Sequence, residues 1–444
     1  MLRSALLVVL LHLCFGGKAP YVSAPVGRPA GQPIKPRPLD ILVDRTRGEL
    51  EVRTSIASFV SNEGPARVEL DLYSMVHVAD RRYYEQIQSR MDAYDVVLYE
   101  LITDDANTMT NGHRRQLLGS IDLYSAKTEA LARAYGLDDQ LSLDLAQPNW
   151  YIADLDTAAV RRLEGPRKPD VLKTFWASRM GGRAFGQLYL KSFFLEDATF
   201  ITILRLISWL APCPEISCLL VDWSRSSTPS KGGGVPLFTA VIPFCMNLVN
   251  CRFAEARRIA FAQQLLTGLP DSGRFGGEAM SDTDVLVRAR NEECMRVVDL
   301  FVAEANNRSS GSGERAECKI ALLYGAYHCI DLQSRLRSRG FALTRSSTAT
   351  AWTMSYPSGG AEGHDVATAR EALSVAALGL AYLLLGAADW FILLRFTSDA
   401  LLAGGPADLL GLALWTLLYA QRHVLVLNGL SSAVVWDRPL FSAL

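Results

Sequence analysis

Two histidines stand where an apolar segment gives way to a polar one. His77 ends the segment YSMVH and His328 ends LLYGAYH, and each follows a small residue, Ser74 or Gly325, by three positions. We predict that each histidine ends a strand and precedes a helix. In an open α/β sheet, ligands bind beyond the carboxyl ends of the strands. We therefore expect both imidazoles to face one site.

A carboxylate follows a neighbouring apolar run. Glu100 lies near the end of VVLYELI, which is typical of a parallel strand buried on both faces. Two imidazoles and a carboxylate in one cleft can hold a divalent metal and activate water. The same three groups can act without a metal, with one histidine as general base and the carboxylate orienting it. The spacing alone also fits two histidines that only bond to the backbone.

The elements that must position these residues alternate between residues 40 and 104. Residues 49–57 alternate polar and apolar side chains, as a half-buried strand does. Residues 68–75 predict a second strand, and ADRRYYEQIQSRMDAYD predicts a helix with apolar positions on one face. The strand at 68–75, this helix and VVLYELI form a predicted βαβ unit, which crosses over right-handed.

The rest of the chain predicts helices and then a return to the sheet. Residues 107–164 have the pattern of broken helices, and 171–310 that of longer ones. The segment CKIALLYGAYH predicts a strand, IDLQSRLRSRGF a helix, and residues 341–356 a closing strand or hairpin. We thus expect a mixed α/β (α+β) domain over 40–360, with a central sheet flanked by helices and a helical insertion at about 107–310.

The N-terminal 39 residues predict a targeting leader outside the fold. One arginine precedes a short apolar run, as in a signal peptide. The whole leader lacks Asp and Glu and continues as a basic, Pro- and Gly-rich stretch that predicts disorder. This composition fits a secreted protein with a flexible leader, and it equally fits a plastid transit peptide. The secretory pathway and the plastid both remain open as locations.

A hydrophobic helical hairpin is predicted at residues 371–428. Residues 372–394 contain one acid, Asp389, and are long enough to span a bilayer. A Gly/Pro turn at 404–406 precedes a second apolar run, which Gln421, Arg422 and His423 interrupt. A buried hairpin of a soluble domain is the alternative. Since a carboxylate is costly in lipid, we expect Asp389 to face a partner helix or water.

Charge and cysteine content limit the function classes. The formal net charge is -1, which gives no electrostatic basis for binding nucleic acid. None of the eight cysteines forms a CxxC pair, so a cysteine zinc knuckle is not expected. Two closely spaced pairs, Cys213/Cys218 and Cys245/Cys251, suit disulfides in an oxidising compartment. The interpretation as small buried side chains is favoured, because free cysteine is often a core residue.

The order of motifs resembles the TraB/TIKI family. SMVHVADRRYYEQIQSRMDAYDVVLYELI is similar to its first motif, GxxH followed by a helix and a strand ending in Glu, with Ser74 in place of the glycine. ALLYGAYHCIDLQSRLRSRGF is similar to its second GxxH motif, and VLVRARNEECMRVV to its Arg-Asn helix, here Arg290 and Asn291. GLDDQLSLDLAQPNWYIADL and the apolar tail resemble membrane-tailed members.

This resemblance implies a mixed α/β fold and, by analogy with the animal TIKI members, a metal-dependent membrane protease. His77, Glu100 and His328 would then be ligands of a divalent metal (Mn, Co or Zn) or acid–base groups. Arg290 would stabilise an oxyanion or bind a substrate carboxylate, and Asn291 would position a ligand. Three further residues after the first motif are weaker candidates, namely Asp80, Tyr83 and Tyr84.

Two functions follow as expectations. The first is a membrane-anchored, metal-dependent hydrolase that acts on peptides or another small substrate, with Glu100, Arg290 and Asn291 in catalysis. The second is a non-catalytic membrane protein of the same fold that binds a ligand such as haem or organises partners. Retention of both histidines favours the first function, and Ser74 mildly favours the second. The sequence gives neither the substrate nor the oligomeric state.

Overall fold

The computed structural model describes residues 37–164, 243–268, 282–356 and 366–434, apart from short gaps at 45–46, 62, 112–113, 119–131, 134, 245, 248–249, 251 and 313–315. Most of the predicted leader and both predicted cysteine pairs lie outside the described residues. Leu39, placed in the leader by the sequence, instead opens the first strand and is 2% exposed. The fold therefore begins one residue earlier than predicted.

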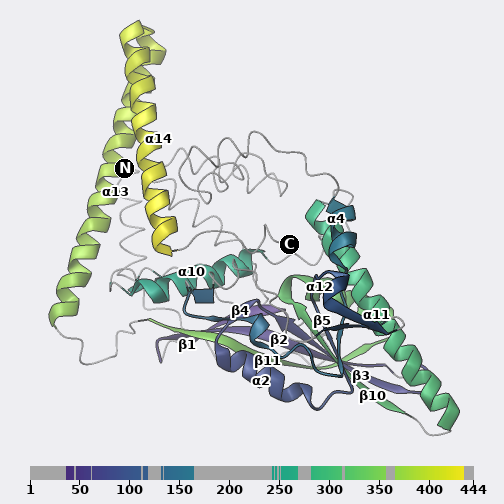
Figure 1. Ribbon diagram of the computed structural model, residues 1–444. Helices are drawn as coiled ribbons and strands as arrows, with labels where there is room; N and C mark the ends of the chain where they lie inside the picture. The colour runs from purple at the N-terminus through teal and green to yellow at the C-terminus, as the bar shows by residue number, and fades with distance from the viewer. Residues whose placement is uncertain are drawn as a thin grey trace, which may run out of the picture.

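A mixed sheet forms the centre of the molecule, as the sequence predicts (Figure 1). Its strand order is β1-β2-β3-β10-β5-β9-β7-β6, and β11 pairs with β2. The strands are β1 Leu39–Asp44, β2 Glu49–Ser61, β3 Arg67–Met75, β5 Val96–Tyr99, β6 Thr108–Asn111, β7 Arg114–Leu117, β9 Trp150–Ile152, β10 Glu317–Gly325 and β11 Ala342–Ser355. The four central strands β3, β10, β5 and β9 run parallel, so their carboxyl ends meet at one edge. A short ladder of β4 (Val78–Ala79) and β8 (Asp138–Asp139) lies beside the sheet.

Helices cover both faces of this sheet. On one face, α2 (Arg81–Met91) and α10 (Phe253–Gly268) pack against side chains such as Tyr73 and Leu323. On the other face, α11 (Asp282–Ser312) and α12 (Ala326–Ser338) pack against their strand neighbours Leu72 and Leu322. Successive residues of a strand thus point to opposite faces of the sheet, and both faces are buried. This is why the sequence of these strands is a continuous apolar run. Short helical segments η1 (Asp105–Asn107), η2 (Gln140–Ser142) and α4 (Thr157–Glu164) complete the described domain.

Three expectations about the sheet are wrong in detail. The described residues within 107–164 are not mainly helical, because β6, β7 and β9 lie there and extend the sheet. Strand β10 lies between β3 and β5, so Glu100 does not follow a strand adjacent to β3. The strand before the second histidine, β10, ends at Gly325. His328 therefore does not end a strand but lies in the first turn of α12. The predicted closing strand at 341–356 is confirmed as β11.

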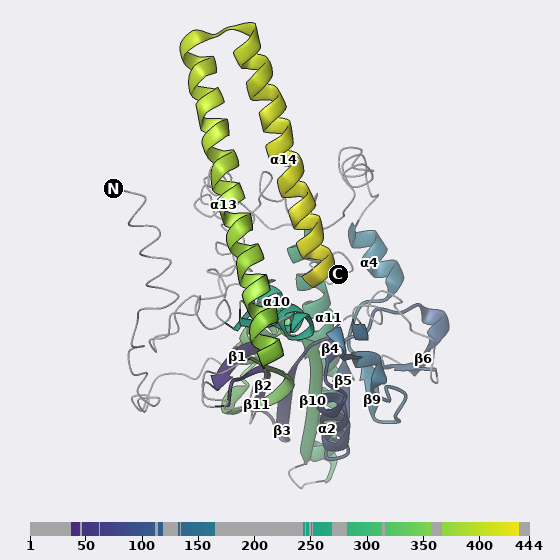
Figure 2. The same cartoon turned by 90° about the vertical axis from the view of Figure 1, so that its left-hand side faces the viewer.

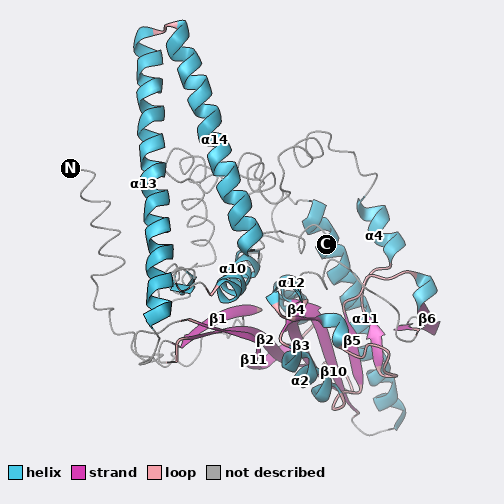
Figure 3. Ribbon diagram, turned by 60° about the vertical axis from the view of Figure 1, so that its left-hand side comes forward, coloured by secondary structure: helices cyan, strands magenta, loops and turns pink. Residues whose placement is uncertain are grey.

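The C-terminal part of the described chain is a long helical hairpin, α13 (Val366–Ala403) and α14 (Pro406–Val434). The two helices run side by side and project away from the sheet (Figures 2 and 3). Gly404, with φ of 62°, turns the chain between them. Within the described ranges, one helix segment, Leu380–Leu402, is long and apolar enough to cross a membrane. Only 6% of its most apolar window is buried, unlike the core helix of a soluble protein.

Candidate functional site

The predicted site residues converge at the carboxyl edge of the parallel strands. Glu100 directly follows β5, Gly325 ends β10, and His77 follows β3. The long helix α11 brings Arg290 and Asn291 to the same edge from the second half of the chain. The parallel order of the strands therefore assembles groups that lie far apart in the sequence.

A buried ion cluster forms the centre of this site. Arg290 Nη2 donates to Glu100 Oε1 at 2.6 Å and to Asp154 Oδ2 at 2.7 Å, while its Nε donates to Asp154 Oδ1 at 3.0 Å. The backbone N–H of Gly325 donates to the second Glu100 oxygen at 2.6 Å. Glu100 is 7% exposed and Arg290 2%. The cluster carries two carboxylates and one guanidinium, so its formal charge is -2 + 1 = -1 when both acids are ionised.

A chain of polar side chains holds the His328 ring next to Glu100. His328 Nδ1 lies 2.7 Å from Asn291 Oδ1, and Asn291 Nδ2 donates to Asp331 Oδ2 at 2.8 Å. The guanidinium of Arg335 donates to the same Asp331 oxygen at 2.6 Å. An amide oxygen only accepts, so Nδ1 of His328 carries the proton. Its Nε2 therefore bears the lone pair, and it lies 3.5 Å from Glu100 Oε1.

The His77 ring is fixed in the same manner, by Gln140, which was not among the predicted site residues. Its Nδ1 lies 3.0 Å from Gln140 Oε1, and its backbone carbonyl accepts from the Gln140 N–H at 2.9 Å. With the amide oxygen facing the ring, Nε2 is again the lone-pair nitrogen. Histidines that bind metals or act as bases are commonly fixed by such a bond on the other nitrogen.

Electrostatics keep His328 and Glu100 both deprotonated near neutral pH. Burial lowers the pKa of His328 to about 4, against a partly opposing effect of Glu100, while Arg290 and His77 lower it further. Burial raises the pKa of Glu100, but Arg290, His328, His77 and the Gly325 N–H lower it more, to about 2. Two electron-pair donors thus face one another without a proton between them. His328 Nε2 has no hydrogen-bond partner in the described part of the chain.

This donor pair fits a divalent cation in part. Imidazole nitrogen and carboxylate oxygen are both ordinary ligands of Zn²⁺ and related metals, and the unpartnered Nε2 lies beside the carboxylate. No group of three or more His, Cys, Asp or Glu side chains with metal-site geometry occurs among the described residues. The guanidinium of Arg290 already occupies one side of Glu100. The structure therefore supplies two of the three predicted ligands in direct proximity, Glu100 and His328.

The weaker candidates after the first motif have structural partners. Tyr83 and Tyr84 are buried, and their hydroxyls lie 3.1 Å from Thr54 Oγ1 and 2.8 Å from the Val76 carbonyl oxygen. Asp80 occupies the N-cap position of α2 without a side-chain capping bond. These three residues therefore serve packing and the start of the helix.

Ser74, the departure from the first GxxH motif, is accommodated by the fold. Its buried hydroxyl lies 3.0 Å from the Ser55 hydroxyl on β2. A partnered hydroxyl costs little in a core. The serine is therefore compatible with the placement of His77 three residues later.

Sequence reasoning missed three members of the site: Asp154, Asp331 and Gln140. Asp154 follows β9 just as Glu100 follows β5, so the segment WYIAD carries the same signal of an acid after an apolar strand. Asp331 lies three residues after His328 on α12, which places both on one helix face. Gln140 has no such signal, because a two-residue ladder brings it to His77.

Gly325 is required at its position by the closeness of Glu100. A Cβ at Gly325 would lie 2.9 Å from Glu100 Oε2, although the backbone there, with φ of -52°, would suit any residue. We expect Gly325→Ala to lower the free energy of unfolding by about 1–3 kcal/mol, the typical effect of overpacking. Urea denaturation measures the change. In a Glu100→Ala background the same substitution should cost less, and equal costs in both backgrounds would refute the contact.

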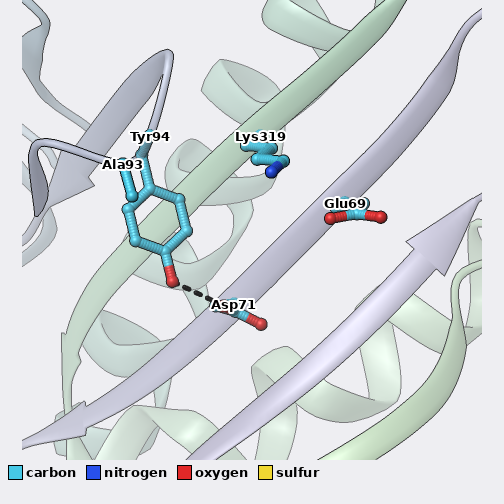
Figure 4. A pocket seen from close by; sticks show the side chains of 5 residues that line it. All are labelled: Glu69, Asp71, Ala93, Tyr94 and Lys319. Atoms are coloured by element: carbon cyan, nitrogen blue, oxygen red, sulfur yellow. Dashed lines mark hydrogen bonds between the residues drawn. The ribbon is translucent and has the colours of Figure 1, made fainter. Parts of the chain in front are cut away.

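A hollow among the described residues lies elsewhere. It has a volume of about 160 Å³ and is lined by Glu69, Asp71, Ala93, Tyr94 and Lys319. Figure 4 shows the Tyr94 hydroxyl pointing to Asp71, to which it donates at 2.5 Å. Lys319 lies opposite Glu69 in the register of β10 and β3, near the amino ends of both strands. This point is roughly 20 Å along the strand from Gly325. This hollow is therefore separate from the Glu100–His328 site.

Comparison with known proteins adds no relative. No protein-family model matches the chain, and neither a curated protein nor a solved structure is significantly similar to it. The functional argument therefore depends on the residues and their geometry.

Proposed function

We propose that this protein is a membrane-anchored, metal-dependent hydrolase of the TraB/TIKI type that cleaves peptide bonds. The observation that carries the proposal is the pair formed by His328 Nε2 and Glu100 Oε1, 3.5 Å apart. Both groups are deprotonated near neutral pH and carry electron pairs at this short distance, which suits a cation, or a water molecule that is to be deprotonated. The order of the two histidine motifs around the Arg-Asn helix supports the same class.

Each residue of the site has a distinct proposed role. His328 offers its Nε2 lone pair to the metal, and Asn291 fixes the ring by accepting a hydrogen bond from Nδ1–H. Asn291 therefore acts behind the histidine, as a group that positions the imidazole and does not contact the metal. Arg290 neutralises Glu100 and Asp154, and its Nη1 is buried without a hydrogen-bond partner among the described residues. That remaining donor suits a carbonyl oxygen on which negative charge develops.

A divalent metal would be held by His328 and Glu100, with His77 as the predicted third ligand. When bound, such a metal lowers the pKa of a coordinated water and polarises a carbonyl group. The site's net negative charge favours a cation. The protein would contribute a fixed imidazole tautomer and a desolvated surrounding, in which charge interactions are stronger than in water.

The membrane part of the proposal is supported by the helix segment Leu380–Leu402, which is long and apolar enough to cross a bilayer. Large apolar side chains are exposed along it, among them Leu384 at 62% and Leu402 at 84%. Exposed apolar surface of this extent is typical of lipid contact. The secretory and plastid locations remain alternative proposals for the N-terminal leader.

A second function, a non-catalytic ligand-binding or scaffold protein of the same fold, is favoured by one observation. Arg290 already pairs with Glu100, and both side chains are almost fully buried. Buried ion clusters can serve only to fix a fold. In that case the network would hold α11 against the strand ends, and the site would take no metal.

Metal content and peptide hydrolysis of the detergent-solubilised full chain distinguish the two functions. We expect the wild type, incubated with Zn²⁺, Mn²⁺ or Co²⁺ and desalted, to retain one of these metals and to hydrolyse members of a fluorogenic peptide library. His328→Ala and Glu100→Gln should lose both properties, and His77→Ala should at least weaken metal retention. Asp299→Asn, which changes an exposed carboxylate on the same helix α11, is the matched control. Equal metal content in all variants would contradict the hydrolase proposal.

A further inference from the structure

The hairpin contains one ion pair that joins its two helices. Asp389 on α13 accepts a hydrogen bond from Arg422 on α14. The indole N–H of Trp415 also donates to the Asp389 carbonyl oxygen at 3.3 Å. The Arg422 guanidinium lies over the rings of Tyr382 and Tyr419, 5.8 and 5.6 Å from their centroids. Both charges are thus satisfied between the helices.

The position of this pair matters for any membrane crossing. Asp389 lies nine residues after Leu380 and thirteen before Leu402, or about 14 Å and 20 Å along the helix. A span of this length placed in a hydrocarbon layer about 30 Å thick would carry an unpaired carboxylate near its middle. Such a residue is costly in lipid unless a partner neutralises it. Here the partner comes from the second helix.

Further charges lie on the turn side of this pair. Arg395 and Asp399 form an exposed pair within α13, and Asp408 lies at the start of α14. Exposed leucines occupy both helices on the domain side of the turn, for instance Leu384 and Leu417. In the described part of the hairpin on the domain side of Arg395, the exposed surface is therefore apolar on both helices, and the two charges there, Asp389 and Arg422, are paired with each other.

We infer that α13 and α14 enter the bilayer together as one hairpin, closed by the Asp389–Arg422 pair. The chain then crosses the membrane twice, so the α/β domain and the C-terminal end lie on the same side. The turn at Gly404 and Gly405 reaches the opposite face. This inference rests on the membrane part of the proposed function and is independent of hydrolysis.

Protease protection of the full-length chain tests the topology. The protein carries an epitope tag after Leu444 and is inserted into microsomes during translation. After proteinase K treatment, we expect the domain and the tag to share one fate, either both digested or both protected. Opposite fates for the domain and the tag would overturn the inference, because they require a single crossing.

Resistance to carbonate extraction tests the ion pair. We expect Asp389→Leu to move most of the protein from the membrane pellet to the supernatant, because it leaves Arg422 without its carboxylate in lipid. The charge-exchanged double variant Asp389→Arg/Arg422→Asp should be retained like the wild type. Asp408→Leu removes a carboxylate at the start of α14, outside the Leu380–Leu402 span, and it should also be retained. Retention of Asp389→Leu at the wild-type level, or wild-type protein that is itself extracted, would overturn the inference without affecting the test of hydrolysis.

Discussion

Arg290→Met is expected to lower the free energy of unfolding by about 3–5 kcal/mol, the typical effect of breaking a buried ion pair by removing one partner. Arg290 pairs with both Glu100 and Asp154, and all three side chains are at most 5% exposed. Without the guanidinium, two carboxylates would face each other in a low-dielectric interior. The midpoint of urea denaturation, followed by far-UV circular dichroism, measures the change.

The control for this prediction lies two residues earlier on the same helix. Arg288 pairs with Glu292 on the exposed side of α11, so Arg288→Met should change stability by less than about 1 kcal/mol. The triple variant Arg290→Met/Glu100→Gln/Asp154→Asn should recover part of the loss, because it removes the uncompensated charges as well. A similar loss for Arg288→Met and Arg290→Met would show that the buried cluster is not the source of the effect.

His328→Gln should reduce kcat/KM for peptide hydrolysis by roughly 10²–10⁴-fold, because the site would lose the Nε2 lone pair that holds the metal and, through it, the means of activating water. Glutamine keeps most of the volume of the ring and can still bond to Asn291, but it has no basic nitrogen at the Nε2 position. The variant should therefore fold with little change in its unfolding midpoint. Steady-state kinetics on the peptide that the wild type cleaves best provides the measurement.

Two further variants separate chemistry from positioning in this prediction. Ser334→Ala changes an exposed position on the same helix α12 and should leave kcat/KM unchanged. Asn291→Ala frees the ring from its hydrogen bond, so it should lower kcat and shift the acid limb of the pH profile. If His328→Gln keeps the wild-type rate, the imidazole takes no part in catalysis.

The sequence predicts the parts of the fold that have long, regular apolar patterns. The strands that became β2, β3, β5, β10 and β11, the helix α2 and the hairpin all carry such patterns, and each is present in the structure. Strand β9 has three residues and β7 four, which is too short for a period to be seen. Their segment was therefore predicted as helical, although both strands belong to the sheet.

The site was predicted to a similar extent. His328, Glu100, Arg290 and Asn291 are brought together, because acids and histidines after parallel strands share one edge of a sheet. Which of these side chains contact one another could not be derived from the sequence, because the contacts depend on the position of β10 between β3 and β5. Asp389 was expected to face a partner helix, and Arg422 confirms this.

The protonation state of His328 tests the account most directly. In protein labelled with ¹⁵N-histidine, long-range ¹H–¹⁵N spectra distinguish the two ring nitrogens, and His328→Gln identifies the signal. We expect a neutral ring at pH 7, with the proton on Nδ1, that titrates with a pKa of about 4, because burial disfavours the charged form. The Nε2 lone pair would then be available from about pH 4 upwards. A ring that carries its proton on Nε2, or one that is doubly protonated at pH 7, would contradict the proposed role of His328.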